Sequence, residues 1–289
     1  MAAKVFQGMK EEDYYGDKSR MSASLLKTAK VNGLASARKM MLGQDKGSKA
    51  MREGWLAHLA VQFPDEFDVK CQTPPEDLKE GILNADGSAP KYPERTKAYA
   101  KAKTEWEINN PDIIPVTKKE MEATLNYREA LWRSPCWREC DEQEIVVHFD
   151  FEDREYKARI DGIAVNDDGS VSLYDWKFVA GTRDFGSKIF RYAYHMQGAL
   201  YSYAFEQAGY VVDSFFLVGV DKQTCCPSYT VCAPLSKEAL DLGIRECRTW
   251  HEAILCSIAT GYWPSVESPN KWEVPSWYED RQLKEGETS

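Results

Sequence analysis

One short segment of the chain places a carboxylate and an ammonium group on the same side of an expected strand. Side chains alternate between the two faces of an extended strand, so the first and third residues of Asp175-Trp176-Lys177 share a face. This pair offers a carboxylate for a metal ion beside an ammonium group. An acid followed two residues later by lysine also occurs at residues 68–70, 77–79 and 155–157, so context must choose among the four.

Asp161 provides that context. It precedes Asp175 by 14 residues, and the turn predicted at 166–169 folds the two strands back against each other, so their carboxylates can meet. Two adjacent carboxylates destabilise each other's charge unless a divalent cation neutralises them. The alternative is that the two acids are separate, solvated strand residues.

Three further polar residues lie on expected helix faces. Gln197 and Tyr201 are four residues apart, so both project from one face of a helix that should pack against the sheet. His58 borders the apolar stripe of Met51, Trp55 and Leu59. The alternatives are buried polar side chains satisfied by the backbone and a packed histidine. Beside a metal site, His58 becomes a candidate ligand.

The elements that must position these residues follow from hydrophobic periodicity and turn residues. We expect an α/β fold with a mixed central sheet flanked by helices, preceded by a helical N-terminal region. Strands are predicted at 145–151, 156–165, 171–177, 211–220 and 229–232, the first three forming an antiparallel meander. Helices are predicted at about 22–32, 34–42, 49–62, 96–109, 117–133, 188–207 and 236–259.

A single domain over residues 1–289 is expected. Its mainly helical part covers 18–135 with a long surface loop at 71–95, its catalytic α/β core covers 140–260, and an extended tail covers 261–289. The tail aromatics should wrap over the body; they are Tyr262, Trp263, Trp272, Trp277 and Tyr278.

Composition predicts a folded protein of the cytoplasm. The chain is 43% hydrophobic and 29% charged, and it shows neither a run apolar enough to span a membrane nor a signal-peptide core. Its eight cysteines lack the paired spacing of zinc ribbons, so reduced thiols are expected.

Charge is unevenly distributed along the chain. The net charge is −9, yet the segment from residue 18 to 52 holds nine basic residues and one acid. This segment is either a phosphate-binding surface or a solvated helical face. The candidate DNA-binding residues are Lys27, Lys30, Arg38, Lys39 and Arg52, with Arg183, Lys188 and Arg191 after the hairpin.

Taken together, these motifs resemble those of the RecE-type (exonuclease VIII-like) exodeoxyribonucleases, in the RecB-like branch of the PD-(D/E)XK nucleases. The resemblance rests on the order and spacing of several segments over most of the chain. These are Ser22–Leu26, Met51–His58, Asp161 with Asp175-Trp176-Lys177, Gln197 with Tyr201, and Val274–Trp277. It implies the PD-(D/E)XK nuclease fold.

The resemblance also implies roles for individual residues. The metal ligands would be His58, Asp161, Asp175 and the backbone carbonyl of Trp176, with Lys177 holding or activating the attacking water. Glu142 is a fifth candidate, although Glu144 is too near to exclude. Gln197 and Tyr201 would position the strand or orient the site. Because the expected ligands are mostly oxygen atoms, we expect Mg²⁺, with Mn²⁺ as a substitute, and the cysteine pattern does not support an iron–sulfur cluster.

The activity implied is 5′ to 3′ digestion of linear double-stranded DNA, which leaves single-stranded DNA for phage-type recombination. The implied partners are DNA ends, a RecT-type single-strand annealing protein, and further copies of the chain in a ring-shaped trimer or tetramer. Three alternatives remain at this point: an endonuclease of restriction or CRISPR-associated type on the same fold, a non-catalytic DNA-binding protein, and a nuclease acting on RNA.

Overall fold

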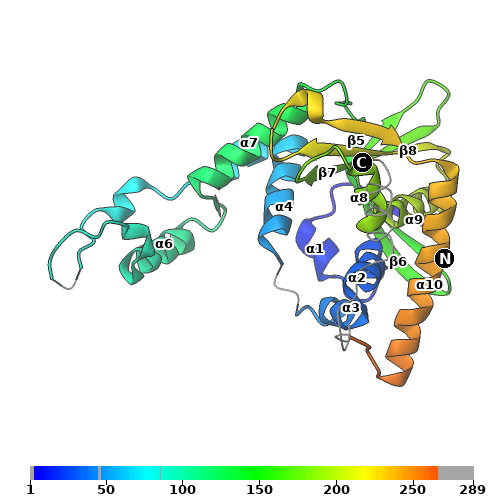
Figure 1. Ribbon diagram of the computed structural model, residues 1–289, viewed down its shortest axis with the longest axis horizontal. Helices are drawn as coiled ribbons and strands as arrows, with labels where there is room; N and C mark the ends of the chain where they lie inside the picture. Colours follow the sequence, from blue (N-terminus) through cyan, green and yellow to red (C-terminus); the bar gives the residue numbers. More distant parts are fainter. Residues whose placement is uncertain (1–2, 45–46, 85, 266–289) are drawn as a thin grey trace, which may run out of the picture.

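A computed structural model describes residues 3–44, 47–84 and 86–265. It confirms an α/β architecture with a mixed central sheet flanked by helices (Figure 1). Of the predicted tail, the expectations for Trp272, Trp277, Tyr278 and Val274–Trp277 lie outside the described residues. Within them, Trp263 packs against the main core and the Ala35 N–H donates to the Pro264 carbonyl at 3.3 Å. Among the described helices, none has the length and apolarity needed to cross a membrane.

The predicted meander forms the centre of the sheet. Strands β5 (Glu142–Phe151), β6 (Arg154–Val165) and β7 (Val171–Val179) pair antiparallel in chain order. Strand β8 (Val212–Asp221) then runs parallel to β7 along its length, and β9 (Val231–Pro234) pairs antiparallel with β8. At the opposite edge lies β1 (Lys4–Phe6), antiparallel to β5, which the sequence did not predict.

The sheet forks between β6 and β7. Their register runs from Val165 opposite Val171 to Gly162 opposite Tyr174 and ends there. Nearer the start of β6, the edge that β7 no longer pairs is taken by the short strand β2 (Met21–Ser22), which runs parallel to β6 at positions 156 and 157. Continuing the register by one step would place Asp161 opposite Asp175, so both acids lie where the strands part.

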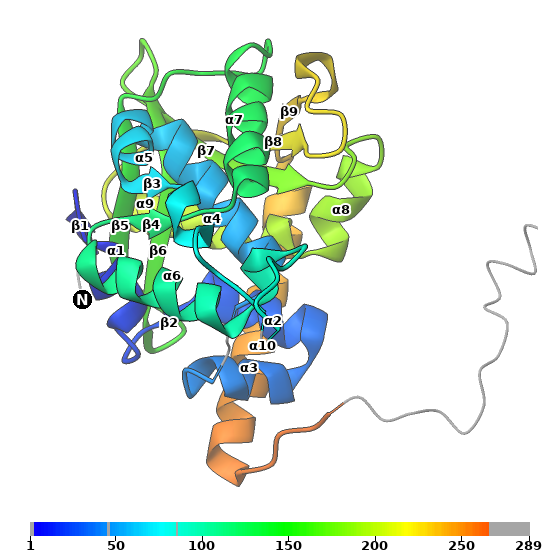
Figure 2. The same cartoon turned by 90° about the vertical axis from the view of Figure 1, so that its left-hand side faces the viewer.

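The helices divide between the two faces of the sheet. One core is built from the sheet, α2 (Ala23–Asn32), α3 (Leu34–Met41), α9 (Tyr194–Gln207) and α10 (Lys237–Thr260). A second core, centred on the fully buried Trp176, joins the other face to α4 (Lys49–Gln62) and α7 (Lys118–Trp132). Figure 2 shows α4 and α7 side by side.

Serine and threonine side chains cap the starts of four helices. The hydroxyls of Ser22, Ser48 and Ser236 each accept a hydrogen bond from a backbone N–H in the first turn of α2, α4 and α10. Thr117 forms a capping box with Glu120 at the start of α7. These side chains satisfy backbone donors that a helix cannot pair internally, which explains why these boundaries were predictable.

One prediction about local structure was wrong. The single helix expected at 188–207 is two helices, α8 (Phe185–Arg191) and α9, separated at Ala193, which adopts a left-handed φ of 55°.

The loop expected at 71–95 is part of an arm that extends from the body (Figure 1). The arm contains β3 (Cys71–Gln72), the 3₁₀ turns η1 (Glu76–Lys79) and η2 (Pro93–Arg95), α6 (Lys97–Asn109) and β4 (Ile114–Pro115), with β3 and β4 paired at its base. The remaining elements are α1 (Glu11–Gly16), α5 (Pro64–Lys70) and η3 (Pro227–Tyr229).

Candidate active site

The fork brings the carboxylates of Asp161 and Asp175 together. The Trp176 N–H, which has no β6 partner at this point, donates to Asp161 Oδ2 at 2.8 Å. Gln62 on α4 donates through Nε2 to the Asp161 carbonyl oxygen at 2.9 Å. Asp175 is 1% exposed and forms an ion pair with the ammonium group of Lys177. Burial raises the pKa of both carboxyls, and the Lys177 charge opposes that rise.

His58 adds a neutral imidazole to the same fork. Its Nδ1 lies 3.6 Å from Asp161 Oδ2, and the ring packs edge-on against Phe178. Burial, helped by the positive charge of Lys177, lowers the pKa of His58 to about 4. Among the described residues this buried Nδ1 has no hydrogen-bond partner. A neutral imidazole whose Nδ1 lacks such a partner and lies beside a carboxylate is available as a metal ligand.

Gln197 and Tyr201 reach the cluster from α9. Gln197 Nε2 donates to Asp175 Oδ1 at 3.1 Å. Tyr201 is 5% exposed and shares a hydrogen bond with Gln197, and burial raises its pKa well above the ordinary value. Both side chains therefore fix the orientation of Asp175 from the face of the sheet that α9 covers.

Lys27, predicted as a DNA-binding surface residue, belongs to this cluster instead. Its Nζ donates to Gln197 Oε1 at 2.7 Å and lies 4.9 Å from the centre of the Tyr194 ring. Burial and the nearby Lys177 charge lower the pKa of Lys27 to about 7. Lys27 follows the buried Ala23 by four residues and so lies on the same side of α2, but the sequence alone did not show this, because the burial of that side depends on how α2 docks.

Of the two glutamates left open, the structure favours Glu144 over Glu142. The β5–β6 register pairs 143 with 162 and 145 with 160, so Glu144 and Asp161 lie between these two pairs. Glu142 stands opposite Ile163 and accepts a hydrogen bond from Gln7 at 3.0 Å. Glu144 has a left-handed φ of 52°, and its Oε2 lies 2.9 Å from Arg159 Nε. Burial, together with the charge of Asp161, raises the pKa of Glu144 to about 7 against the opposing charge of Arg159.

The remaining predicted DNA-binding residues divide into two groups. Three are engaged within the fold: Lys30 pairs with Glu246, Arg52 pairs with Glu120 at 2.8 Å, and Lys188 is 8% exposed, donating to the carbonyls of Ala180 and Gly181 at 3.0 and 2.7 Å. Lys188 is therefore unavailable to a phosphate. Arg38, Lys39, Arg183 and Arg191 are exposed, and Arg52 stays exposed as well despite its ion pair.

The donors at the fork suit a hard divalent cation only in part. Within the described ranges, no three His, Cys, Asp or Glu side chains gather closely enough to enclose a metal ion by themselves. Lys177 supplies the positive charge beside Asp175. The unpaired His58 Nδ1 and the two carboxylates are nevertheless the donor types that Mg²⁺ or Mn²⁺ accepts when backbone and water oxygens complete the shell.

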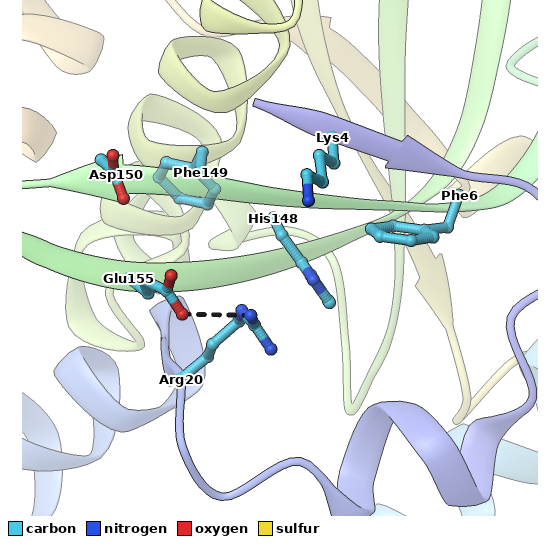
Figure 3. Close-up of a pocket in the computed structure, with 7 residues that line it drawn as sticks. All are labelled: Lys4, Phe6, Arg20, His148, Phe149, Asp150 and Glu155. Carbon is cyan, nitrogen blue, oxygen red and sulfur yellow. Dashed lines mark ion pairs between the residues drawn. The ribbon is translucent and has the colours of Figure 1, made fainter. Parts of the chain in front are cut away.

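A small pocket on another part of the sheet contains none of the predicted site residues. It lies where β1, β5 and β6 meet, and Arg20 and Glu155 form an ion pair of 3.0 Å in it (Figure 3). The chemistry predicted from the sequence is therefore concentrated at the fork and not in this pocket.

Comparison with known proteins adds a structural relative. No family model and no curated protein matches the chain. A crystal structure from Eubacterium rectale, described as a "putative exonuclease", shares the fold over 96% of this chain and 98% of its own, with 16% sequence identity and a TM-score of 0.54. A solved structure of SSO0001 matches 53% of this chain and 69% of its own at 14% identity, and its TM-score of 0.29 carries no argument.

Proposed function

We propose that this protein is a Mg²⁺-dependent nuclease of the PD-(D/E)XK type and, more specifically, an exodeoxyribonuclease that degrades linear double-stranded DNA. The observation that carries the proposal is the meeting of Asp161 and Asp175 at the fork, with Lys177 on the same strand and His58 facing Asp161. The fold shared with the Eubacterium rectale protein is consistent with this proposal.

The residues that would hold the cation are Asp161, Asp175, His58 and the carbonyl of Trp176. The N–H and C=O groups of one strand residue point to the same side, and the Trp176 N–H points to Asp161, so its carbonyl faces the fork as well. Glu144 supports this set from β5. When bound, Mg²⁺ or Mn²⁺ would supply charge neutralisation on the phosphoryl oxygens and lower the pKa of a bound water.

The other side chains prepare the site for hydrolysis of a phosphodiester. The Lys177 side chain is 15% exposed and held by Asp175, so its ammonium group can orient a water molecule and stabilise negative charge that develops on the phosphate. Gln197 fixes Asp175 through Oδ1, and Tyr201 and Lys27 fix Gln197. This second layer keeps the carboxylate in one orientation, a requirement for a precise metal site.

The finer aspects of the proposal rest on the resemblance of the motifs. They are 5′ to 3′ polarity, single-stranded product for phage-type recombination, a RecT-type annealing partner, a ring-shaped trimer or tetramer, and a cytoplasmic location. The exposed Arg38, Lys39, Arg183 and Arg191 are the side chains available for DNA phosphates. Salt-dependent DNA binding whose affinity decreases when the charges of these four side chains are reversed would support a path for the DNA along them.

The test is Mg²⁺-dependent degradation of matched linear and closed circular duplex DNA. We expect loss of the linear form only, and loss of that activity in Asp175→Asn. Asp77→Asn is the matched control, because Asp77 begins the same acid-x-lysine pattern on the exposed η1 of the arm. Cutting of the circle would indicate an endonuclease, degradation of RNA alone would change the substrate, and full activity of Asp175→Asn would overturn the proposed centre.

A further inference from the structure

Aromatic rings lead from the candidate catalytic lysine to the protein surface. The Tyr194 ring centre lies 5.1 Å from Lys177 Nζ and 4.9 Å from Lys27 Nζ, so this ring borders the cluster directly. The Tyr192 ring follows at 5.8 Å from Tyr194, with the two planes inclined by 47°. An aromatic path therefore continues outward from the fork.

The backbone is bent to make this path. Residues two apart in a continuous helix point in nearly opposite directions, so Tyr192 and Tyr194 would not meet in the single helix that periodicity predicts. Their contact depends on the break between α8 and α9, where Ala193 has a φ of 55°. A left-handed φ destabilises the backbone at a residue other than glycine, and such strained residues are commonly retained at functional sites.

The outer end of the path is accessible and positively charged. Tyr192 is 38% exposed and Phe190, two residues before it, is 45% exposed. Arg191 between them is exposed as well. Single exposed aromatics are ordinary, but Tyr192 stands beside an exposed arginine and is joined through Tyr194 to a candidate catalytic lysine, a combination suited to binding unpaired bases.

We propose that Tyr192 is a stacking site for an unpaired base of the substrate strand, with Arg191 available to the adjacent phosphate. This inference rests on the proposed nuclease function and adds a substrate requirement: the strand near the fork is single-stranded where it passes Tyr192. Because every base presents a π-face, stacking there selects unpaired nucleic acid without selecting a base sequence.

Binding can be measured separately from hydrolysis. The full chain carrying Asp175→Asn is titrated into fluorescein-labelled oligothymidylate and into an oligonucleotide of equal length made of abasic sites. Tyr192→Ala removes the ring, and Tyr192→Phe keeps the ring while removing the hydroxyl. Tyr92→Ala is the matched control, because Tyr92 is 45% exposed, lies in the arm and also has cationic neighbours, Lys91 and Arg95.

We expect Tyr192→Ala to weaken oligothymidylate binding by about 10-fold, within the range for loss of one base–aromatic stack. Tyr192→Phe and Tyr92→Ala should bind oligothymidylate as tightly as the parent does. Tyr192→Ala and its parent should bind the abasic oligonucleotide with equal affinity. Equal losses on both strands, or equal effects of Tyr192→Ala and Tyr92→Ala, would overturn the stacking site. If the binding results are as expected but the protein cleaves no nucleic acid, the nuclease proposal is overturned and the stacking site is retained.

Discussion

Lys27 controls the orientation of the Gln197 amide. An ammonium group can only donate hydrogen bonds, so the carbonyl oxygen of Gln197 must face Lys27, and its NH₂ group is then presented to Asp175 Oδ1. Substituting methionine for Lys27 keeps a side chain of similar length but removes the charge and the donor. The amide is then free to rotate and to place its oxygen against the carboxylate.

The expected size of this effect follows from the type of contact. Hydrogen bonds to charged groups contribute about 1.5–3 kcal/mol, and both the Lys27–Gln197 and the Gln197–Asp175 contacts belong to that class. A loss of about 2 kcal/mol in the transition state corresponds to roughly 30-fold in rate. We therefore predict that Lys27→Met lowers kcat on linear duplex DNA by roughly 30-fold. KM should stay within about 3-fold of the wild-type value, because Lys27 faces the Gln197 amide and not the path of the DNA.

A double-mutant cycle separates positioning from general destabilisation. Lys27→Met, Gln197→Ala and the double variant are compared for kcat and for the free energy of unfolding in denaturant. Lys30→Met is the control, because Lys30 lies one turn along α2 and pairs with Glu246 on α10. In the Gln197→Ala background, Lys27→Met should cause little further loss of kcat.

Additive losses of kcat in the two single variants would refute the orientation argument, as would a loss in Lys30→Met equal to that in Lys27→Met. If the protein cleaves no DNA at all, the unfolding experiment still measures the coupling between Lys27 and Gln197. Absence of that coupling would show that the hydrogen bond does not hold the amide.

Three other perturbations test separate parts of the structure. His58→Leu should remove the thermal stabilisation by Mn²⁺ while leaving the metal-free melting temperature unchanged or higher, because a buried unpaired nitrogen costs about 1–3 kcal/mol; a retained Mn²⁺ shift would exclude His58 as a ligand. Glu144→Gln should reduce kcat much more than Glu142→Gln. Because the folded pKa of Glu144 is raised to about 7 from 4.5, the folded state binds its proton more tightly, so wild-type stability in EDTA should decline as pH rises between these values, and Glu144→Gln should reduce that slope. Gly243→Ala should lower the free energy of unfolding by about 1–3 kcal/mol, since its Cβ would lie 2.5 Å from the His195 carbonyl oxygen, whereas Gly54→Ala, with open space, should raise it by about 0.5–1 kcal/mol; equal effects in denaturant titrations would contradict this packing.

Local patterns were sufficient for most elements. The turn at 166–169 and the alternation of the flanking strands determine that Asp161 and Asp175 lie on neighbouring strands, because a short antiparallel connection leaves few alternative registers. The helices predicted from about 22, 49, 117 and 236 likewise begin at the serine and threonine caps of α2, α4, α7 and α10. The broken helix at Ala193 escaped prediction, because alanine is a strong helix former and its left-handed φ arises from packing around it.

Long-range contacts decided the rest of the site. Whether Lys27 is a surface cation or a partner of Gln197, 170 residues away, depends on how α2 docks against α9, which no local pattern encodes. The choice between Glu142 and Glu144 depends on the β5–β6 register and on Arg159 across it. The sequence by itself determined the chemical groups and the hairpin that joins them; the tertiary structure determined the fork, because β2, from the N-terminal region, takes the edge of β6 that β7 leaves.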